Sequence, residues 1–218
     1  MQQRSTPLIA MAFTLVVVAC SSASTGELAS GSTVELPIAE ILAYEYDVVS
    51  DPLAFAARSD LIVVGTIQAI EHAAYQEGET YEDNGSLVEE GRTETVALVV
   101  EVEKSFKGPV APGDLIRIGW DAFTVDSNGN RLEEWSMNGV RVPKIGKTYM
   151  WILREPEDYE ADFFEQANVT HRIINFDSVL LVNPAGRIVP VLQDPQRLSA
   201  QFAGRTVQEV VKMLGVDG

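Results

Sequence analysis

The chain has 218 residues, and its 32 acidic and 16 basic side chains give a formal net charge of −16 at pH 7. We expect this charge to repel DNA, RNA and anionic lipid head groups, because binding to them depends on Lys and Arg side chains that neutralise phosphates. The charge therefore disfavours nucleic-acid binding. The length suits one domain with extensions, and the single cysteine, Cys20, can form no internal disulfide.

The first 19 residues have the three parts of a secretory signal peptide. Arg4 and the terminal amine give a positive start, residues 8–19 are apolar apart from Thr14, and a small residue precedes Cys20. The apolar stretch is shorter than the roughly 20 residues that a membrane-spanning helix needs. We therefore predict export and removal of residues 1–19 rather than a permanent transmembrane segment.

The residues around the predicted cleavage point, Val17-Val18-Ala19-Cys20, resemble the lipobox of bacterial lipoproteins. The resemblance implies that Cys20 becomes the first residue of the mature protein and carries diacylglycerol, which holds the protein on a membrane. The expected location is extracytoplasmic, on the outer face of the cell membrane or, where the organism has one, on the outer membrane. The alternative is an ordinary signal peptide that is cut nearby, in which case Cys20 has no such role.

The mature chain begins with a segment of low complexity. Residues 20–33 are rich in Ser, Gly, Ala and Thr, which is typical of a flexible tether. We interpret residues 34–218 as a single mainly β domain whose residues 34–50 form a partly ordered lead-in. Asp51 and Pro52 then predict a short helix over residues 53–58, since Asp is a favoured N-cap and Pro suits the first helical position.

Most of the remaining sequence has strand patterns. The apolar run 61–67 predicts a buried strand, in which Gly65 predicts a bulge or bend. Alternating polarity over residues 93–106 predicts a strand with one buried face. Further strands, separated by turn residues, are expected at 115–120, 148–153, within 169–176, at 179–182 and at 188–191.

The C-terminal segment predicts a helix. Thr206 and Glu209 form a capping box, and an apolar stripe follows over residues 206–214. Several short strands followed by one helix indicate a mainly β fold: a small antiparallel barrel or sandwich with a C-terminal helix.

Four segments carry a resemblance to bacterial secreted proteins whose domain is similar to OB-fold or netrin-like barrels. The first is an Ala-Arg-Ser-Asp segment followed by a Val-rich strand, at residues 57–67, and the second is a strand that ends in Lys-Gly, at residues 100–108. The other two are turns: Pro-Gly-Asp, within residues 112–116, and Gly-Lys-Thr-Tyr, at residues 146–149. The resemblance covers roughly residues 52–155. Its motifs are those of strands and turns, so it implies a fold of the OB or netrin type and no particular activity.

The most acidic part of the chain is the stretch from Glu77 to Glu94, which we expect to form a long hairpin loop. Oxygen-rich loops suit Ca²⁺, which takes six to eight oxygen ligands. The spacing fits no calcium-loop pattern, however, and acidic loops are usually only solvated. The weak candidate ligands are Glu77, Glu79, Glu82, Asp83, Glu89 and Glu90.

The histidines and tryptophans are the other candidates for a site. His72 and His171 lack the spacing of a zinc site, so we interpret both as ordinary strand-end or loop residues. Trp120 and Trp151 lie in predicted strands and are expected to fill the core. Trp135 lies in a segment interpreted as a polar loop and is the candidate for an exposed contact.

The sequence contains no motif for nucleophilic catalysis, phosphate binding or dinucleotide binding, so we assign no catalytic residue and expect no cofactor. The preferred hypothesis is a non-enzymatic, membrane-tethered module that contacts a protein or polymer of the cell envelope. One alternative is an envelope hydrolase that uses a pair of carboxylates. Another is a Ca²⁺-responsive envelope protein.

Overall fold

A computed structural model describes residues 36–41, 49–78, 80–83, 86–89 and 91–216. The predicted signal peptide, Cys20 and the predicted tether lie outside the described residues. All described residues belong to one compact unit within residues 36–218. None of the helices in the described ranges has the length and apolar character that crossing a bilayer requires.

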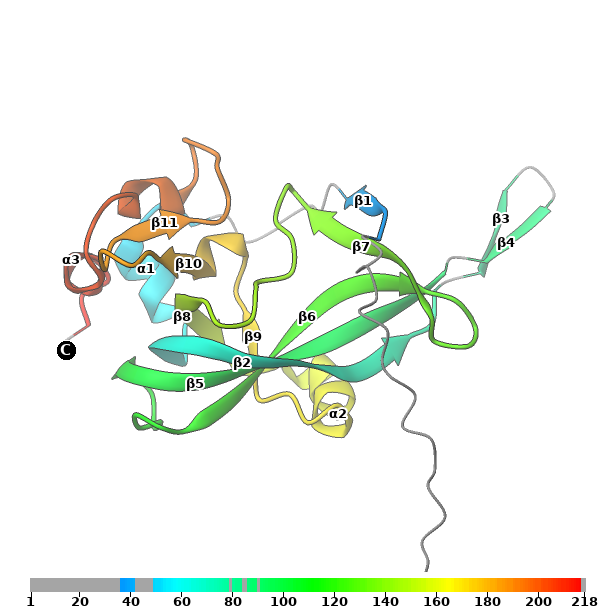
Figure 1. Cartoon of the computed structure of the whole chain (residues 1–218), viewed down its shortest axis with the longest axis horizontal. Coiled ribbons are helices and arrows are strands. Elements are labelled where there is room, and N and C mark those ends of the chain that lie inside the picture. The colour runs from blue at the N-terminus through cyan, green and yellow to red at the C-terminus, as the bar shows by residue number, and fades with distance from the viewer. Residues whose placement is uncertain (1–35, 42–48, 79, 84–85, 90, 217–218) are drawn as a thin grey trace, which may run out of the picture. The chain divides into compact units, whose positions relative to one another are not determined.

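Five strands of the main sheet form a ring (Figure 1). Antiparallel pairs join β6 to β5, β5 to β2 and β2 to β8, and the short β9 closes the ring by pairing with β8 and with β6. Because β9 has only three residues, the ring is not a regular barrel. The strands are β2 (Leu61–Gln76), β5 (Arg92–Lys107), β6 (Leu115–Val125), β8 (Thr148–Arg154) and β9 (His171–Ile173).

The same sheet extends beyond the ring at both ends. β7 (Arg131–Met137) pairs with β6, and β1 (Ile38–Ile41) runs parallel to β7. At the other end, β10 (Val179–Val182) pairs with β8, and β11 (Ile188–Pro190) follows it in a hairpin. β3 (Thr80–Asp83) and β4 (Ser86–Glu89) form a separate two-stranded sheet.

The predicted class, a mainly β fold with a barrel-like arrangement and a C-terminal helix, is confirmed. The sheet is mixed rather than wholly antiparallel, since β1 with β7 and β6 with β9 are parallel pairs. Each of these parallel pairs joins two segments that are far apart in the chain. The sequence pattern of either segment does not indicate its partner.

Helices α1 (Pro52–Ala57) and α3 (Val207–Met213) form where their capping residues predict them. The side chain of Asp51 accepts the N–H of Leu53, and those of Thr206 and Glu209 cap the start of α3 reciprocally. Short 3-10 helices, η1 (Phe176–Ser178) and η2 (Leu198–Phe202), complete the C-terminal part.

Helix α2 (Asp158–Gln166) was not predicted, because its acidic sequence has no clear apolar stripe. It joins β8 to β9 and packs through Phe164 against Ala97, on the outer face of β5. It thereby forms one wall of the pocket described below.

Two main cores lie on the two faces of the strands β2 and β8. One contains Trp120 and Trp151, which are buried as predicted, and the apolar face of β5. The other lies under α1 and α3 and contains Phe55, Met150 and Val211. Since β2 and β8 face a core on both sides, their sequences are apolar at consecutive positions.

Three local predictions need correction. β2 runs to Gln76, well beyond the predicted strand 61–67. Glu94 lies in β5 and is buried, so it is not part of a solvated loop. Trp135 lies in strand β7 rather than in a loop, and its half-buried indole donates from Nε1 to Oγ1 of Thr124 at 2.9 Å.

Candidate functional site

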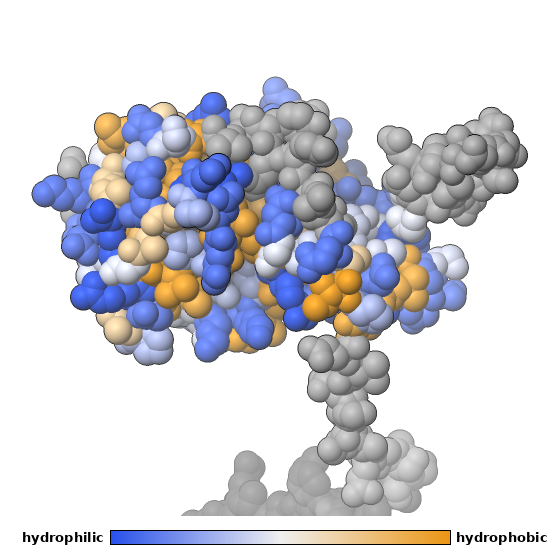
Figure 2. Space-filling view, turned by 90° about the horizontal axis from the view of Figure 1, so that it is seen from above, coloured by the Kyte–Doolittle hydropathy of each residue, from blue (hydrophilic) through white to orange (hydrophobic). Residues whose placement is uncertain are grey.

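A pocket of about 540 Å³ lies where β2 ends, between β6, β9 and α2, and we call it the Arg172 pocket. This volume is in the range of small-ligand sites, about 300–1,000 Å³. Seen from above, the described surface has hydrophobic residues in small groups among hydrophilic ones (Figure 2). The pocket is lined by Tyr75, Gln76, Glu77, Asp121, Glu160, Phe163, Phe164 and Arg172.

The guanidinium of Arg172 has donor atoms without hydrogen-bond partners. Its Nε and Nη1 are buried and have no hydrogen-bond partner among the described residues, while its Cζ lies 4.5 Å from the ring centre of Phe164. Two carboxylates lie at ion-pair distance: Nη2 is 3.7 Å from Oδ2 of Asp121, and Nε is 3.9 Å from Oε1 of Glu160. Buried donors normally have partners, so these N–H groups indicate a place for a ligand or water oxygen.

The position of Arg172 follows from its pairing with a glycine. Arg172 is opposite Gly119 in the parallel pair of β9 with β6. A Cβ at residue 119 would lie 3.3 Å from Cδ of Arg172 and 3.1 Å from both Phe164 and Val169. Because Gly119 has no side chain, there is room at this position for the side chain of Arg172 and for Phe164 of α2.

Glu160 is held by a second arginine. Nη1 and Nη2 of Arg154 donate to its two carboxylate oxygens at 2.7 and 3.2 Å, and the N–H of Glu157 donates at 2.9 Å. Burial acts to raise the pKa of Glu160, but these hydrogen bonds and the charges of Arg154 and Arg172 outweigh it, so the pKa lies below its ordinary value. Glu160 is therefore ionised near neutral pH.

Asp121 is oriented from the opposite wall by Thr95 and Gln76. Oγ1 of Thr95 donates to Oδ1 of Asp121 at 2.6 Å, and Nε2 of Gln76 lies 3.1 Å from Oγ1 of Thr95 and 3.5 Å from the same carboxylate oxygen. The pocket thus presents fixed carboxylate acceptors beside unpartnered guanidinium donors.

The carboxyl groups with a resolved pKa shift bear on the hydrolase alternative. A glycosidase of that kind has a general acid whose pKa is raised so that it holds a proton near neutral pH. The four carboxyl groups of the described residues with a resolved shift, Glu94, Asp126, Glu160 and Glu209, all have lowered pKa values. In the pocket, Glu160 is an acceptor and not a proton donor.

A second polar cluster, centred on Glu94, lies beside the pocket. Glu94 is 3% exposed and bonds to Arg131 through both carboxylate oxygens, at 2.7 and 3.0 Å. Nδ1 of His72 lies 3.1 Å from Oε1 of Glu94, and the His72 ring is 4.3 Å from that of Tyr75, which lines the pocket. The cluster thus contacts the pocket wall through Tyr75, while His72 itself does not line the pocket.

Of the six predicted ion ligands, the structure describes the side chain of Glu77, which lines the pocket and pairs with Nε of Arg92 at 2.8 Å. The side chains of Glu79, Glu82, Asp83, Glu89 and Glu90 lie outside the described residues. Among the side chains that the structure does describe, no group of three His, Cys, Asp or Glu residues could hold a metal ion.

His171 lies on β9 next to Arg172, away from any second histidine. Its Nδ1 is 2.8 Å from Oγ1 of Thr170, within the same short segment. Burial lowers the pKa of His171, against the smaller opposite effects of Glu155 and Asp60. Near neutral pH it is therefore an uncharged side chain, and it does not line the Arg172 pocket.

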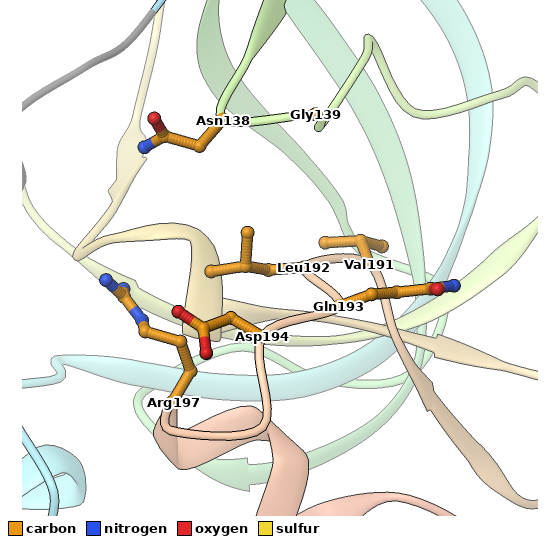
Figure 3. A pocket seen from close by; sticks show the side chains of 7 residues that line it. All are labelled: Asn138, Gly139, Val191, Leu192, Gln193, Asp194 and Arg197. Carbon is orange, nitrogen blue, oxygen red and sulfur yellow. The ribbon is translucent and has the colours of Figure 1, made fainter.

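A second hollow lies between the β7–β8 connection and the segment after β11. Asn138 and Gly139 lie on one side, and Leu192, Asp194 and Arg197 lie on the other (Figure 3). Arg197 is paired with the buried Asp177, with 3.0 Å between Nε and Oδ2. An adjoining apolar groove of about 370 Å³ shares Gly139, Val191 and Gln193 with this hollow.

No protein-family model matches the chain, and no curated protein matches it. The main residues of the Arg172 pocket, Asp121, Glu160 and Arg172, were not singled out from the sequence. They are far apart in the chain, and each has the appearance of an ordinary surface charge. Arg172 lies in a short strand between a polar and an apolar neighbour. This pattern could have drawn attention to it, but many arginines share the pattern.

Proposed function

We propose that this protein is a membrane-tethered binding module of the bacterial cell envelope that holds hydroxyl-rich units of an envelope glycan in the Arg172 pocket. The observation that carries the proposal is the pair of buried, unpartnered donors of Arg172 between the carboxylates of Asp121 and Glu160. The role is one of binding and not of catalysis.

The chemistry of the pocket favours a neutral ligand with hydroxyl groups. A hydroxyl donates one hydrogen bond and accepts others, so it can satisfy a guanidinium N–H and a carboxylate oxygen together. Three carboxylates in the pocket are offset by three arginines, because Arg154, Arg92 and Arg172 lie beside Glu160, Glu77 and Asp121. The charges around the pocket therefore balance, and a strongly charged ligand would find no excess of the opposite charge there.

Aromatic side chains supply the apolar part of such a site. Phe163 and Tyr75 line the pocket, and the rings of Phe163 and Phe164 make an edge contact with centres 4.9 Å apart. The C–H face of a sugar ring can pack on an aromatic ring while its hydroxyls meet the polar wall. Together these features favour a glycan over a purely anionic or purely apolar ligand.

Binding can be tested by co-sedimentation of the mature protein with insoluble peptidoglycan. We expect retention of the unmodified chain and about ten-fold weaker binding for Arg172→Gln, since a hydrogen bond to a charged group contributes about 1.5–3 kcal/mol. Arg187→Gln is the matched control, because Arg187 bonds to Gly204 away from the pocket. Equal retention of both variants, with unchanged melting temperatures, would contradict the proposal.

The tethering part of the proposal rests on the lipobox resemblance of residues 17–20. Mass spectrometry of the N-terminal peptide from membranes is expected to show diacylglycerol on Cys20, and Cys20→Ser should release the protein from the membrane fraction. An unmodified Cys20 thiol in the membrane-bound protein would be incompatible with lipid anchoring. The outcome is independent of the glycan test.

A further inference from the structure

The apolar groove beside β11 has a charge pattern opposite to that of the whole chain. Acidic residues outnumber basic ones two to one in the sequence. Among the described residues that line the groove, three are basic, Arg141, Lys144 and Lys147, and none is acidic. A cationic rim on so acidic a protein gives local attraction for an anionic ligand.

Two of these three cations are available for a ligand. Arg141 is engaged, because Nε and Nη2 donate to the two carboxylate oxygens of Glu134. Lys144 and Lys147 are exposed, and neither ammonium has an acidic partner within the described part of the chain. The anionic group of a ligand would therefore meet these two lysines.

The floor of the groove consists of aliphatic side chains from several elements. Val142 and Pro143 come from the β7–β8 connection, Leu181 from β10, and Val189 and Pro190 from β11. Val189 is 38% exposed, although it is a large apolar residue. Covering this floor with an aliphatic chain would remove apolar surface from water, which contributes about 25 cal/mol per Å².

An aliphatic chain suits this floor better than an extended peptide does. A bound peptide strand would need hydrogen-bond partners for its backbone. The backbone groups at the adjacent edge of β11 already bond to other residues of the chain. The N–H of Ile188 donates to the carbonyl of Arg205 and its carbonyl accepts from Gly204, at 2.8 and 2.9 Å. Pro190 has no N–H to offer.

We propose that this groove binds an aliphatic chain that ends in an anionic group, such as a fatty acid. The aliphatic chain lies on Val142, Leu181 and Val189, and the carboxylate lies between Lys144 and Lys147. This site is separate from the Arg172 pocket, because the two share no lining residue. The inference therefore stands whether or not the pocket binds a glycan.

Decanoate is the probe, followed by backbone amide shifts in an NMR titration at low ionic strength and pH 8. We expect saturable shifts that centre on residues 140–147 and 189–193. The double variant Lys144→Ala/Lys147→Ala should bind about ten-fold more weakly, and Val189→Asp should abolish binding. Lys104→Ala/Lys212→Ala is the control of equal charge, because these lysines do not line the groove.

Two further ligands separate the contributions of charge and chain. Decanol lacks the charge and butyrate lacks the long chain, so each should bind at least several-fold more weakly than decanoate. Decanoate affinity that is unchanged in the Lys144/Lys147 variant, or shifts centred elsewhere, would overturn the proposal. Tighter binding of a short peptide rich in Glu and Val would overturn it as well, and would assign the groove to a protein segment.

Discussion

Glu94 and Arg131 form a two-pronged ion pair that connects β5 to β7 across the intervening strand β6. Nε and Nη2 of Arg131 donate to the two carboxylate oxygens, and the guanidinium lies 4.0 Å from the ring centre of Phe123 in β6. The carboxylate is nearly inaccessible to solvent. Forked contacts of this kind hold both partners in a fixed orientation, so the pair fixes β7 relative to β5.

Glu94→Gln should lower the free energy of unfolding at pH 7 by about 2 kcal/mol, the scale of a hydrogen bond to a charged group. Burial acts to raise the pKa of Glu94, but the bonds and charges of Arg131 and His72 lower it from 4.5. The stabilisation is thus present above pH 4.5 and is lost as the pH falls through the lowered pKa.

Urea unfolding at pH 7 and at pH 3 measures this difference. The gap between the unmodified chain and Glu94→Gln should narrow at the lower pH, whereas Glu133→Gln, on the same strand as Arg131, should have little effect at either pH. A gap of equal size at both pH values would show that the ionised carboxylate of Glu94 is not the source of the stabilisation.

His171 makes the stability of the protein depend on pH in a second, higher pH range. Burial lowers its pKa from 6.5, so below about pH 6.5 the unfolded chain binds more protons than the folded chain. Acid therefore favours unfolding in this range. We expect stability to fall between pH 7.5 and pH 5.5, and His171→Gln to flatten that part of the profile. An identical slope in the variant would exclude His171 as its cause.

The strands could be predicted because their signals are local. Val96, Leu98, Val100 and Val102 lie at every second position and do face one core. The caps of α1 and α3 lie within three residues of the helices that they start. The Arg172 pocket could not be predicted in this way. Arg172 in β9 comes close to Asp121 in β6 because these two strands pair in parallel. The sequence around either residue does not indicate that pairing.

Gly65 is a position where the predicted irregularity does occur. The register of β2 against β5 shifts between Val64 and Gly65. A Cβ at residue 65 would lie 2.6 Å from the carbonyl oxygen of Glu101 and 2.6 Å from a methyl group of Val100. Since the backbone oxygen cannot move without disturbing the sheet, Gly65→Ala should destabilise by about 1–3 kcal/mol.

Thermal unfolding measures this cost, which corresponds to a loss of several degrees in the melting temperature. Gly91→Ala is the comparison, because among the described residues its added methyl would meet one atom, Cγ2 of Thr124, at 3.0 Å. A Gly65→Ala protein as stable as Gly91→Ala would mean that the strand relaxes around the new methyl group.

Gly119→Ala tests how closely the fold of β6 is coupled to the pocket. The added Cβ would lie 3.1 Å from Cε1 of Phe164 and 3.3 Å from Cδ of Arg172, so both side chains must shift by a few tenths of an ångström. We expect about 1–2 kcal/mol of destabilisation and weaker retention on peptidoglycan, since the donors of Arg172 move with its side chain.

The double variant Gly119→Ala/Phe164→Leu distinguishes crowding from a general loss of stability. Leucine removes the ring edge that the new methyl group would meet, so the costs of the two substitutions should be less than additive, by at least 0.5 kcal/mol. If the costs simply add, the methyl group is accommodated elsewhere, and the space left by Gly119 does not determine where Arg172 and α2 lie. Because the same substitutions are scored for retention on peptidoglycan, a recovery of stability without a recovery of binding would locate the binding defect in Phe164 itself.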